Sequence, residues 1–128
     1  MFDYQKTIDH DNHLVHIRVT GEIGISDGKL IIVEARTEAI RLKYNLLYDL
    51  REMTSRTNLN ELYMAVRELP VFKEIQALHM RTGILHASDV RSDRYKFYAN
   101  TASNVGLSVR IFTDEREALD WVTAEDAA

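Results

Sequence analysis

The sequence contains no cysteine among its 128 residues. This absence excludes disulfides, thiol nucleophiles and thiolate metal sites together. Proline occurs once and glycine five times, and no internal repeat or low-complexity segment is visible, so the composition is that of an ordinary globular protein. A chain of this length buries roughly two-thirds of its unfolded surface on folding. We therefore expect a single domain over residues 1–128 that folds without metal, disulfide or cofactor.

Long apolar runs are also missing, because no stretch approaches the ~18 residues that a membrane span requires. The first residues, Met1–Lys6, have neither the basic start nor the apolar core of a signal peptide. Positive charge is not in excess either: 16 Lys and Arg stand against 20 Asp and Glu, for a net charge of −4 with both signs interspersed. A nucleic-acid binder needs a basic patch. We expect a soluble cytoplasmic protein that binds no nucleic acid.

Alternating apolar and polar residues predict an antiparallel hairpin at the amino end. The alternation runs over 2–8 and again over 14–19, and the polar, turn-forming stretch Asp9–His13 separates the two runs. Gly21 and Gly24 then bracket the exit from the second strand. The sequence thus predicts two paired strands before any helix.

A helix is predicted from about Ser26 to about Lys43, where apolar residues recur at helical spacing and Ser26 or Asp27 offers an N-cap. One alternative stays open, in which Asp27 and Gly28 form a hairpin turn and Leu30–Val33 a strand. The helix is favoured because strong helix formers follow Val33.

The rest of the chain alternates between strand and helix patterns, with one ambiguous stretch at Val71–Leu78. The expected elements are a buried strand at Asn45–Leu50, a polar loop at Arg51–Asn58, a helix at Leu59–Leu69 ended by Pro70, a strand around Met80–Ala87, a helix from Ser88 or Asp89 to about Val105, a strand at Leu107–Phe112 and a helix at Thr113–Val122. This order predicts an α/β fold: a β-hairpin, then alternating strands and helices, in a mostly parallel five-stranded sheet covered by about four helices.

No catalytic motif is present. The histidines have no spacing typical of a metal site, since none are i, i+4 partners and His13 and His16 are expected on opposite faces of a strand; the set is His10, His13, His16, His79 and His86. A nucleophile elbow is absent, and Gly21–Gly24 is too sparse for a phosphate loop. The pairs Ser88–Asp89 and Ser92–Asp93 suit helix caps. We expect no metal, no cofactor and no enzyme.

Asp49 stands near the end of a predicted parallel strand, where open α/β sheets often place ligand-binding groups. Pairing with Arg51 or capping of a loop is the favoured interpretation. Two sets of basic residues could hold an anion, but solvated faces balanced by neighbouring acids are favoured for both. The sets are Arg51, Arg56 and Arg67, and Arg91, Arg94 and Lys96.

The end of the chain reads as a strand that runs directly into a capped helix. Thr113 is the expected N-cap, Asp114, Glu115 and Glu117 suit the positive end of the helix, and the apolar residues beyond them form a packing face with Trp121 at its margin. This segment, Val109–Val122, together with the turn at Gly21–Ile25 and the strand Leu46–Leu50, resembles the SpoIIAA-like family. That family comprises small bacterial proteins with the STAS-type fold of sporulation anti-anti-sigma factors, a fold also likened to Sec14 lipid carriers.

In anti-anti-sigma factors an Asp-Ser-Ser-Gly type segment follows the equivalent strand, and its serine is phosphorylated by a partner kinase. The comparable stretch here is Met53–Asn58, which keeps hydroxyls but lacks the Ser-Gly pattern. A phosphate there would meet a helix amino terminus and arginines. The resemblance implies a switch or partner loop formed by Asp49, Thr54, Ser55, Arg56, Thr57 and Asn58.

The resemblance implies a non-enzymatic regulatory or protein-interaction domain with an unidentified protein partner. The alternative is a small-molecule or lipid carrier with a pocket between the sheet and the third helix, and an enzyme comes third. A homodimer is one way to cover an exposed edge strand.

Overall fold

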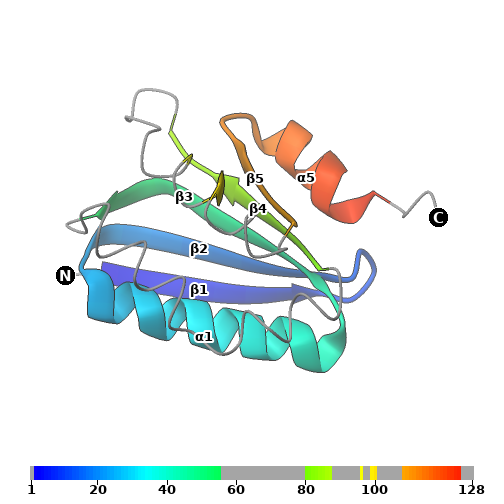
Figure 1. Cartoon of the computed structure of the whole chain (residues 1–128), viewed down its shortest axis with the longest axis horizontal. Helices are drawn as coiled ribbons and strands as arrows, with labels where there is room; N and C mark the ends of the chain where they lie inside the picture. The colour runs from blue at the N-terminus through cyan, green and yellow to red at the C-terminus, as the bar shows by residue number, and fades with distance from the viewer. Residues whose placement is uncertain (1, 56–79, 88–95, 97–98, 101–107, 125–128) are drawn as a thin grey trace.

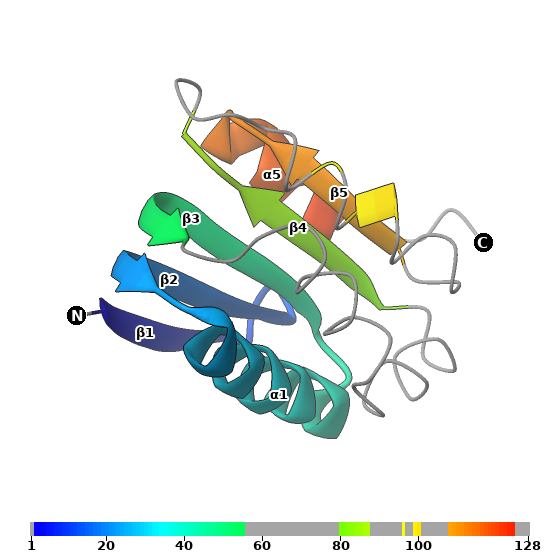
Figure 2. The same cartoon turned by 60° about the vertical axis from the view of Figure 1, so that its left-hand side comes forward.

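The computed structural model describes residues 2–55, 80–87, 96, 99–100 and 108–124. Its strands form one five-stranded sheet in the order β1-β2-β3-β4-β5, with α1 on one face and α5 on the other (Figures 1 and 2). The elements are β1 (Phe2–Asp9), β2 (Leu14–Ile23), α1 (Ile25–Leu42), β3 (Asn45–Ser55), β4 (Arg81–Leu85), β5 (Ser108–Phe112) and α5 (Glu115–Thr123).

The sheet is mixed. β1 and β2 form the predicted antiparallel hairpin, and the pairings β2–β3, β3–β4 and β4–β5 are parallel. The α/β class is therefore confirmed, and the expectation of a mostly parallel sheet is corrected by the hairpin strand, which adds an antiparallel edge. α1 forms the crossover that parallel neighbours such as β2 and β3 require.

Two helices, and not about four, are found within the described part of the chain. The other two predicted helices lie wholly or mostly outside that part. Lys96, Ala99 and Asn100, from the third predicted helix, do have helical backbone. Other predictions lie outside the described residues: the helix at 59–69, the stretch 71–78, His79, the pairs Ser88–Asp89 and Ser92–Asp93, and Arg67, Arg91 and Arg94.

The hairpin turn corrects the prediction for His13. This residue lies in the turn, not on a strand, and its φ of 53° is in the left-handed region. Strand β2 continues past the predicted end at Val19, through Gly21 at φ 88°, to Ile23. The longer strand arises because β1 pairs with β2 as far as Gly21 and β3 pairs with it as far as Ile23.

Helix α1 confirms the helical interpretation and excludes the alternative strand at Leu30–Val33. Its N-cap is Gly24, which makes no side-chain cap, so the predicted capping by Ser26 or Asp27 is wrong. Asp27 instead lies in the first turn, where its charge favours the amino end. The helix ends at Lys43, whose left-handed backbone lets its N–H bond to carbonyls of the last turn.

Strand β3 runs to Ser55, so the predicted loop at Arg51–Asn58 is corrected for its first five residues. They form strand because β2 offers continuing parallel partners up to Ile23. Pairing shifts from Arg18–Asp49 to Thr20–Glu52, so three steps along β3 match two along β2. This β-bulge redirects the side chains that follow Asp49.

Each face of the sheet carries its own apolar layer. The α1 layer is the larger, and its buried residues are Val15, Ile17, Val19, Ile23, Ile31, Ala35, Ala39, Leu46, Tyr48, Met80 and Ile84. The α5 layer is built from Leu14, Leu47, Leu85, Ala118 and Val122. At Gly83 a Cβ atom would lie 2.9 Å from Val122 and 3.1 Å from Leu47, so glycine permits the close approach of α5 to β4.

The closing strand and helix match their predicted order, with a different cap. Asp114, not Thr113, is the N-cap of α5, and its carboxylate accepts a hydrogen bond from the Glu117 backbone N–H at 3.0 Å. Asp114 has the extended backbone that is typical of an N-cap, and its side chain is the one that bonds to the first turn of the helix. Trp121 packs at the margin of the α5 layer, as expected.

Candidate functional site

The candidate site begins with an ion pair on β3. Asp49 and Arg51 are two residues apart, and both guanidinium contacts are short: Nε to Oδ1 at 2.9 Å and Nη2 to Oδ2 at 2.7 Å. The Arg51 backbone N–H also donates to Oδ1 at 3.2 Å. Asp49 is buried, with 5% of its surface exposed. The predicted pairing of Asp49 with Arg51 is confirmed, in a bidentate form that fixes both side chains.

The ion pair extends to the start of α5. Arg51 Nη2 lies 2.6 Å from Glu115 Oε2, and this second pair is half-exposed. Glu115 belongs to the first turn of α5, next to the N-cap Asp114. The chain Asp49–Arg51–Glu115 therefore joins β3 to the amino end of α5.

The electrostatics keep this chain charged. Burial alone would raise the pKa of Asp49, but the hydrogen bonds from Arg51 outweigh it and hold that pKa below its ordinary value. The electrostatic interaction with His16 lowers the pKa of Asp49 as well. The pKa of Arg51 is raised, chiefly by its hydrogen bond to Asp49. Asp49 is therefore an ionised, occupied carboxylate and not a group poised to exchange a proton near neutral pH.

Two further polar groups on β2 lie beside the ion-pair chain. His16 is paired across the sheet with Thr7 of β1 and Leu47 of β3, and its buried Nε2 has no hydrogen-bond partner among the described residues. Arg18 bonds Glu52 at 2.8 Å on the exposed part of the same face. The α5 face of the sheet thus carries a polar band from β2 to β3.

Of the predicted site residues, the structure describes Asp49 and Thr54 in full, and these two lie apart on β3. Thr54 is exposed near the end of β3, where it pairs with Glu22, and Ser55 is the last residue of that strand. Thr54 lies five positions further along β3 than Asp49, a distance of roughly 16 Å. Arg56, Thr57 and Asn58 lie outside the described residues. Asp49 therefore belongs to the ion-pair chain, and Thr54 to the exposed end of the strand.

Sequence reasoning missed the second half of this site. Glu115 was interpreted only as an acid at a helix start, and its partner Arg51 is 64 positions away. No local pattern signals such a contact. The involvement of His16 was missed for the same reason, because a strand histidine shows no motif in sequence.

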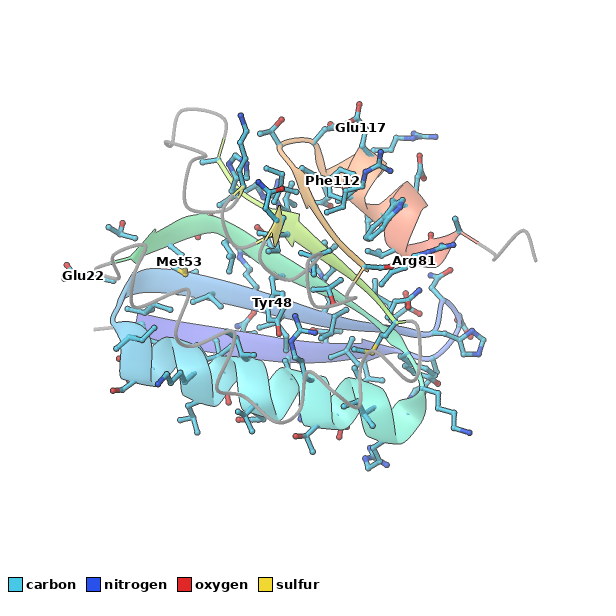
Figure 3. All side chains as sticks on the ribbon, viewed as in Figure 1. Glu22, Tyr48, Met53, Arg81, Phe112 and Glu117 are labelled. Atoms are coloured by element: carbon cyan, nitrogen blue, oxygen red, sulfur yellow. The ribbon has the colours of Figure 1, made fainter. Side chains whose placement is uncertain are left out.

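A second polar cluster lies in the α1 layer. Arg36 is fully buried on α1, and its Nη1 donates to Thr82 Oγ1 of β4 at 3.4 Å. Tyr48 of β3 is buried in the same layer (Figure 3). The burial of Arg36 could have been predicted from the sequence, because this residue stands at helical spacing from Ile32 and Ala39 on the apolar face.

Within the described ranges, no three His, Cys, Asp or Glu side chains form a group that could hold a metal ion. None of the helices described is both long enough and apolar enough to span a bilayer.

The sequence matches no protein-family model and no curated protein. The structure is similar to the crystal structure of an uncharacterised protein of the DUF3478 family from Shewanella loihica PV-4, which is described as having a SpoIIAA-like fold. The TM-score is 0.59 at 17% sequence identity, and the match covers 94% of this chain and 93% of the other. The expected resemblance therefore extends to three dimensions, and the chain has a SpoIIAA-like fold.

Proposed function

We propose that this protein is a regulatory or protein-interaction domain of STAS type and not an enzyme. The observation that carries the proposal is the SpoIIAA-like fold, which extends over 94% of the chain. In the STAS proteins that the sequence resembles, the segment after the equivalent of β3 carries the switch. In this chain the same strand ends at Thr54 and Ser55, and Thr54 is exposed.

The state of Asp49 supports this proposal over an enzymatic role. Both of its oxygens are bonded to Arg51, which in turn reaches Glu115. A general acid or base needs a free position and a pKa near the working pH. The lowered pKa of Asp49 and its two bonds fit a role in holding α5 against β3.

The proposed contact surface is the exposed end of β3. Arg51, Glu52 and Thr54 are exposed there, so charged and hydroxyl groups are available to a partner. A phosphate on Thr54 or Ser55 would add about two negative charges at neutral pH. Phosphorylation would then weaken or create contacts with a partner according to the charge that the partner presents.

Co-purification from the native host tests the proposal. The tagged protein should recover a specific partner, and Thr54→Arg should abolish that recovery. Thr7→Arg is the matched control, because Thr7 is also an exposed strand threonine but lies on β1. If cross-linking at low salt recovers no specific protein, or if both variants recover it equally, the proposal fails. Intact-mass measurement of the same material detects phosphorylation.

A carrier of small anionic or lipid molecules is the second candidate, favoured by three buried polar side chains of the α1 layer: Arg36, Thr82 and Tyr48. A guanidinium and two hydroxyls inside an apolar layer can hold a carboxylate or phosphate head while the layer covers an apolar tail. Thermal unfolding with oleate or a lysophospholipid tests this candidate, because a ligand that binds only the native state raises Tm.

Arg36→Met should remove that rise in Tm, whereas Arg41→Met, at an exposed position of the same helix, should preserve it. A Tm unchanged by either probe in the unmodified protein would eliminate this candidate.

A further inference from the structure

A shallow groove lies between β5 and α5, away from the end of β3. It has a volume of 620 Å³. Phe112 and Trp121 supply aromatic surface, with ring centroids 5.8 Å apart. Arg110 extends over Trp121, its guanidinium carbon 5.8 Å from the ring centroid. Glu117 and Asp120 of α5 also line the groove, and Figure 3 shows Phe112 and Glu117 at this junction.

The backbone beside the groove is that of an edge strand. In the described sheet β5 pairs only with β4 and is the outermost strand on that side (Figure 2). An outer strand edge presents N–H and C=O groups that can pair with another extended chain. Side chains of an added strand would alternate between the two faces of the sheet. Those on the α5 face would lie beside Arg110 and Phe112, in the groove.

The charges of the groove select among such chains. Glu117 and Asp120 are exposed, are three residues apart on α5 and form no ion pair with the described residues. The charge of Arg110 is placed over the indole of Trp121. The groove therefore offers an aromatic floor and two carboxylates on the helix side, which together favour an apolar side chain followed by a basic one.

We propose that the groove binds an extended segment of a partner protein, which adds as a further strand beside β5. The segment places an apolar side chain against Phe112 and Trp121 and a basic side chain between Glu117 and Asp120. A second copy of this chain fits less well: in an antiparallel pair of β5 strands, the central Arg110 would face its own symmetry mate, and like charges directly opposite are destabilising. The surface is distinct from the contact proposed at the end of β3.

Defined peptides test the proposal with the intact chain. The probe is a fluorescein-labelled ten-residue peptide with Thr at outward positions and with Leu and Lys at successive inward positions. A matched peptide carries Glu in place of Lys, and a third carries N-methyl groups on the backbone. Fluorescence polarisation gives Kd, and NMR amide shifts locate the contact. The Lys peptide should bind about tenfold more tightly than the Glu peptide, a difference of about 1.4 kcal/mol.

Asp120→Lys should reverse the preference between the two peptides. Asp11→Lys, the same charge change in the exposed β1–β2 turn, should leave it unchanged. N-methylation should abolish binding, and amide shifts should appear along β5. Equal affinities for the Lys and Glu peptides, no response to Asp120→Lys, or unmoved β5 amides would each overturn the proposal.

Analytical sedimentation tests whether a second copy of this chain, and not a partner protein, occupies the groove. A concentration-dependent dimer that Asp120→Lys dissociates would assign the groove to a second copy and overturn the partner proposal. Because the peptide assay does not involve Thr54, a failed co-purification from the native host leaves its result unaffected.

Discussion

An 18-residue helix packs on one face of the sheet, and a 9-residue helix packs on the other. α1 lies against β2 and β3, and α5 against β3, β4 and β5. Among the described residues, the α1 layer buries eleven hydrophobic residues in one cluster and the α5 layer buries five. On the face of the sheet that α5 covers, part of the surface is occupied by the polar band, which contains the ion-pair chain. The small apolar layer and the ion-pair chain Asp49–Arg51–Glu115 therefore act together to hold α5 against the sheet.

The two helices also begin differently. α1 starts at Gly24 without a side-chain cap, whereas α5 starts at Asp114 with one. A long helix with a broad buried face obtains its stability mainly from packing. A helix of nine residues depends more on its cap and on the ion pair at its first turn.

The largest expected difference in unfolding free energy between the two layers comes from substituting two neighbouring residues of β3. Leu46 and Leu47 are both fully buried, one in each layer. Leu46→Ala should cost about 4–5 kcal/mol of unfolding free energy and Leu47→Ala about 2–3 kcal/mol, because the short helix α5 can move to fill the cavity. Urea unfolding measures both values. Equal costs, or a larger cost for Leu47→Ala, would contradict the proposed contrast.

The ion-pair chain should give the next largest effect. Asp49→Asn should cost about 1.5–3 kcal/mol at neutral pH, since it removes charge-assisted hydrogen bonds at a buried site. The folded-state pKa of Asp49 lies below its ordinary value of 3.8, so its stabilisation is complete above that value and is lost as the pH falls through the folded pKa.

Urea unfolding at a series of pH values checks this sign. The unmodified protein should lose stability on acidification below pH 3.8 more steeply than Asp49→Asn does. Asp11→Asn, in the exposed turn, provides the charge-matched control and should follow the unmodified protein. Parallel curves for all three proteins would show that Arg51 does not stabilise the ionised carboxylate.

The helix starts provide a third, smaller test. Asp114→Ala should cost about 1 kcal/mol, because it leaves a backbone donor of α5 without its side-chain acceptor. Gly24→Ala at the start of α1 removes no side-chain hydrogen bond and should cost less, about 0.5 kcal/mol, because alanine is a poorer N-cap residue than glycine. Thermal unfolding of the two variants compares them directly, and a greater loss for Gly24→Ala would reverse the interpretation.

The smallest effect is expected at the exposed end of the ion-pair chain. Glu115→Gln should cost at most about 1 kcal/mol, because both partners are about half exposed. The cost should shrink at high salt, which screens exposed pairs more than buried ones. Repeating the measurement for Asp49→Asn, which should depend less on salt, separates the buried from the exposed half of the chain.

Local patterns predicted much of the fold. Alternation and turn residues predicted the hairpin, and helical spacing predicted α1 and the closing helix. The apolar run at Asn45–Leu50 predicted a central buried strand, and Leu46 and Leu47 are indeed fully buried. These features depend on side chains close in sequence, so they can be read without the fold. The caps were less predictable, because the N-cap is the last residue with extended backbone before each helix, and the sequence does not show where the extended backbone of Gly24 or Asp114 ends.

The candidate site was predictable only in part. Asp49 and Arg51 are neighbours on one strand, so their pairing could be predicted from the sequence. The continuation of β3 past Arg51 could not, because polar residues there form strand only when β2 supplies partners. Glu115 lies 64 positions from Arg51, and Arg36 lies 46 from Thr82, so the fold alone brings each pair together.

By itself, the sequence determined the α/β class, the order of the described elements and the absence of cysteine chemistry, because composition and periodicity act locally. Only the tertiary structure decided which face each helix covers, how far β3 extends, and which charges meet between β3 and α5. The physical reason is that sheet pairing and ion pairing join residues whose separation along the chain carries no information about their separation in space.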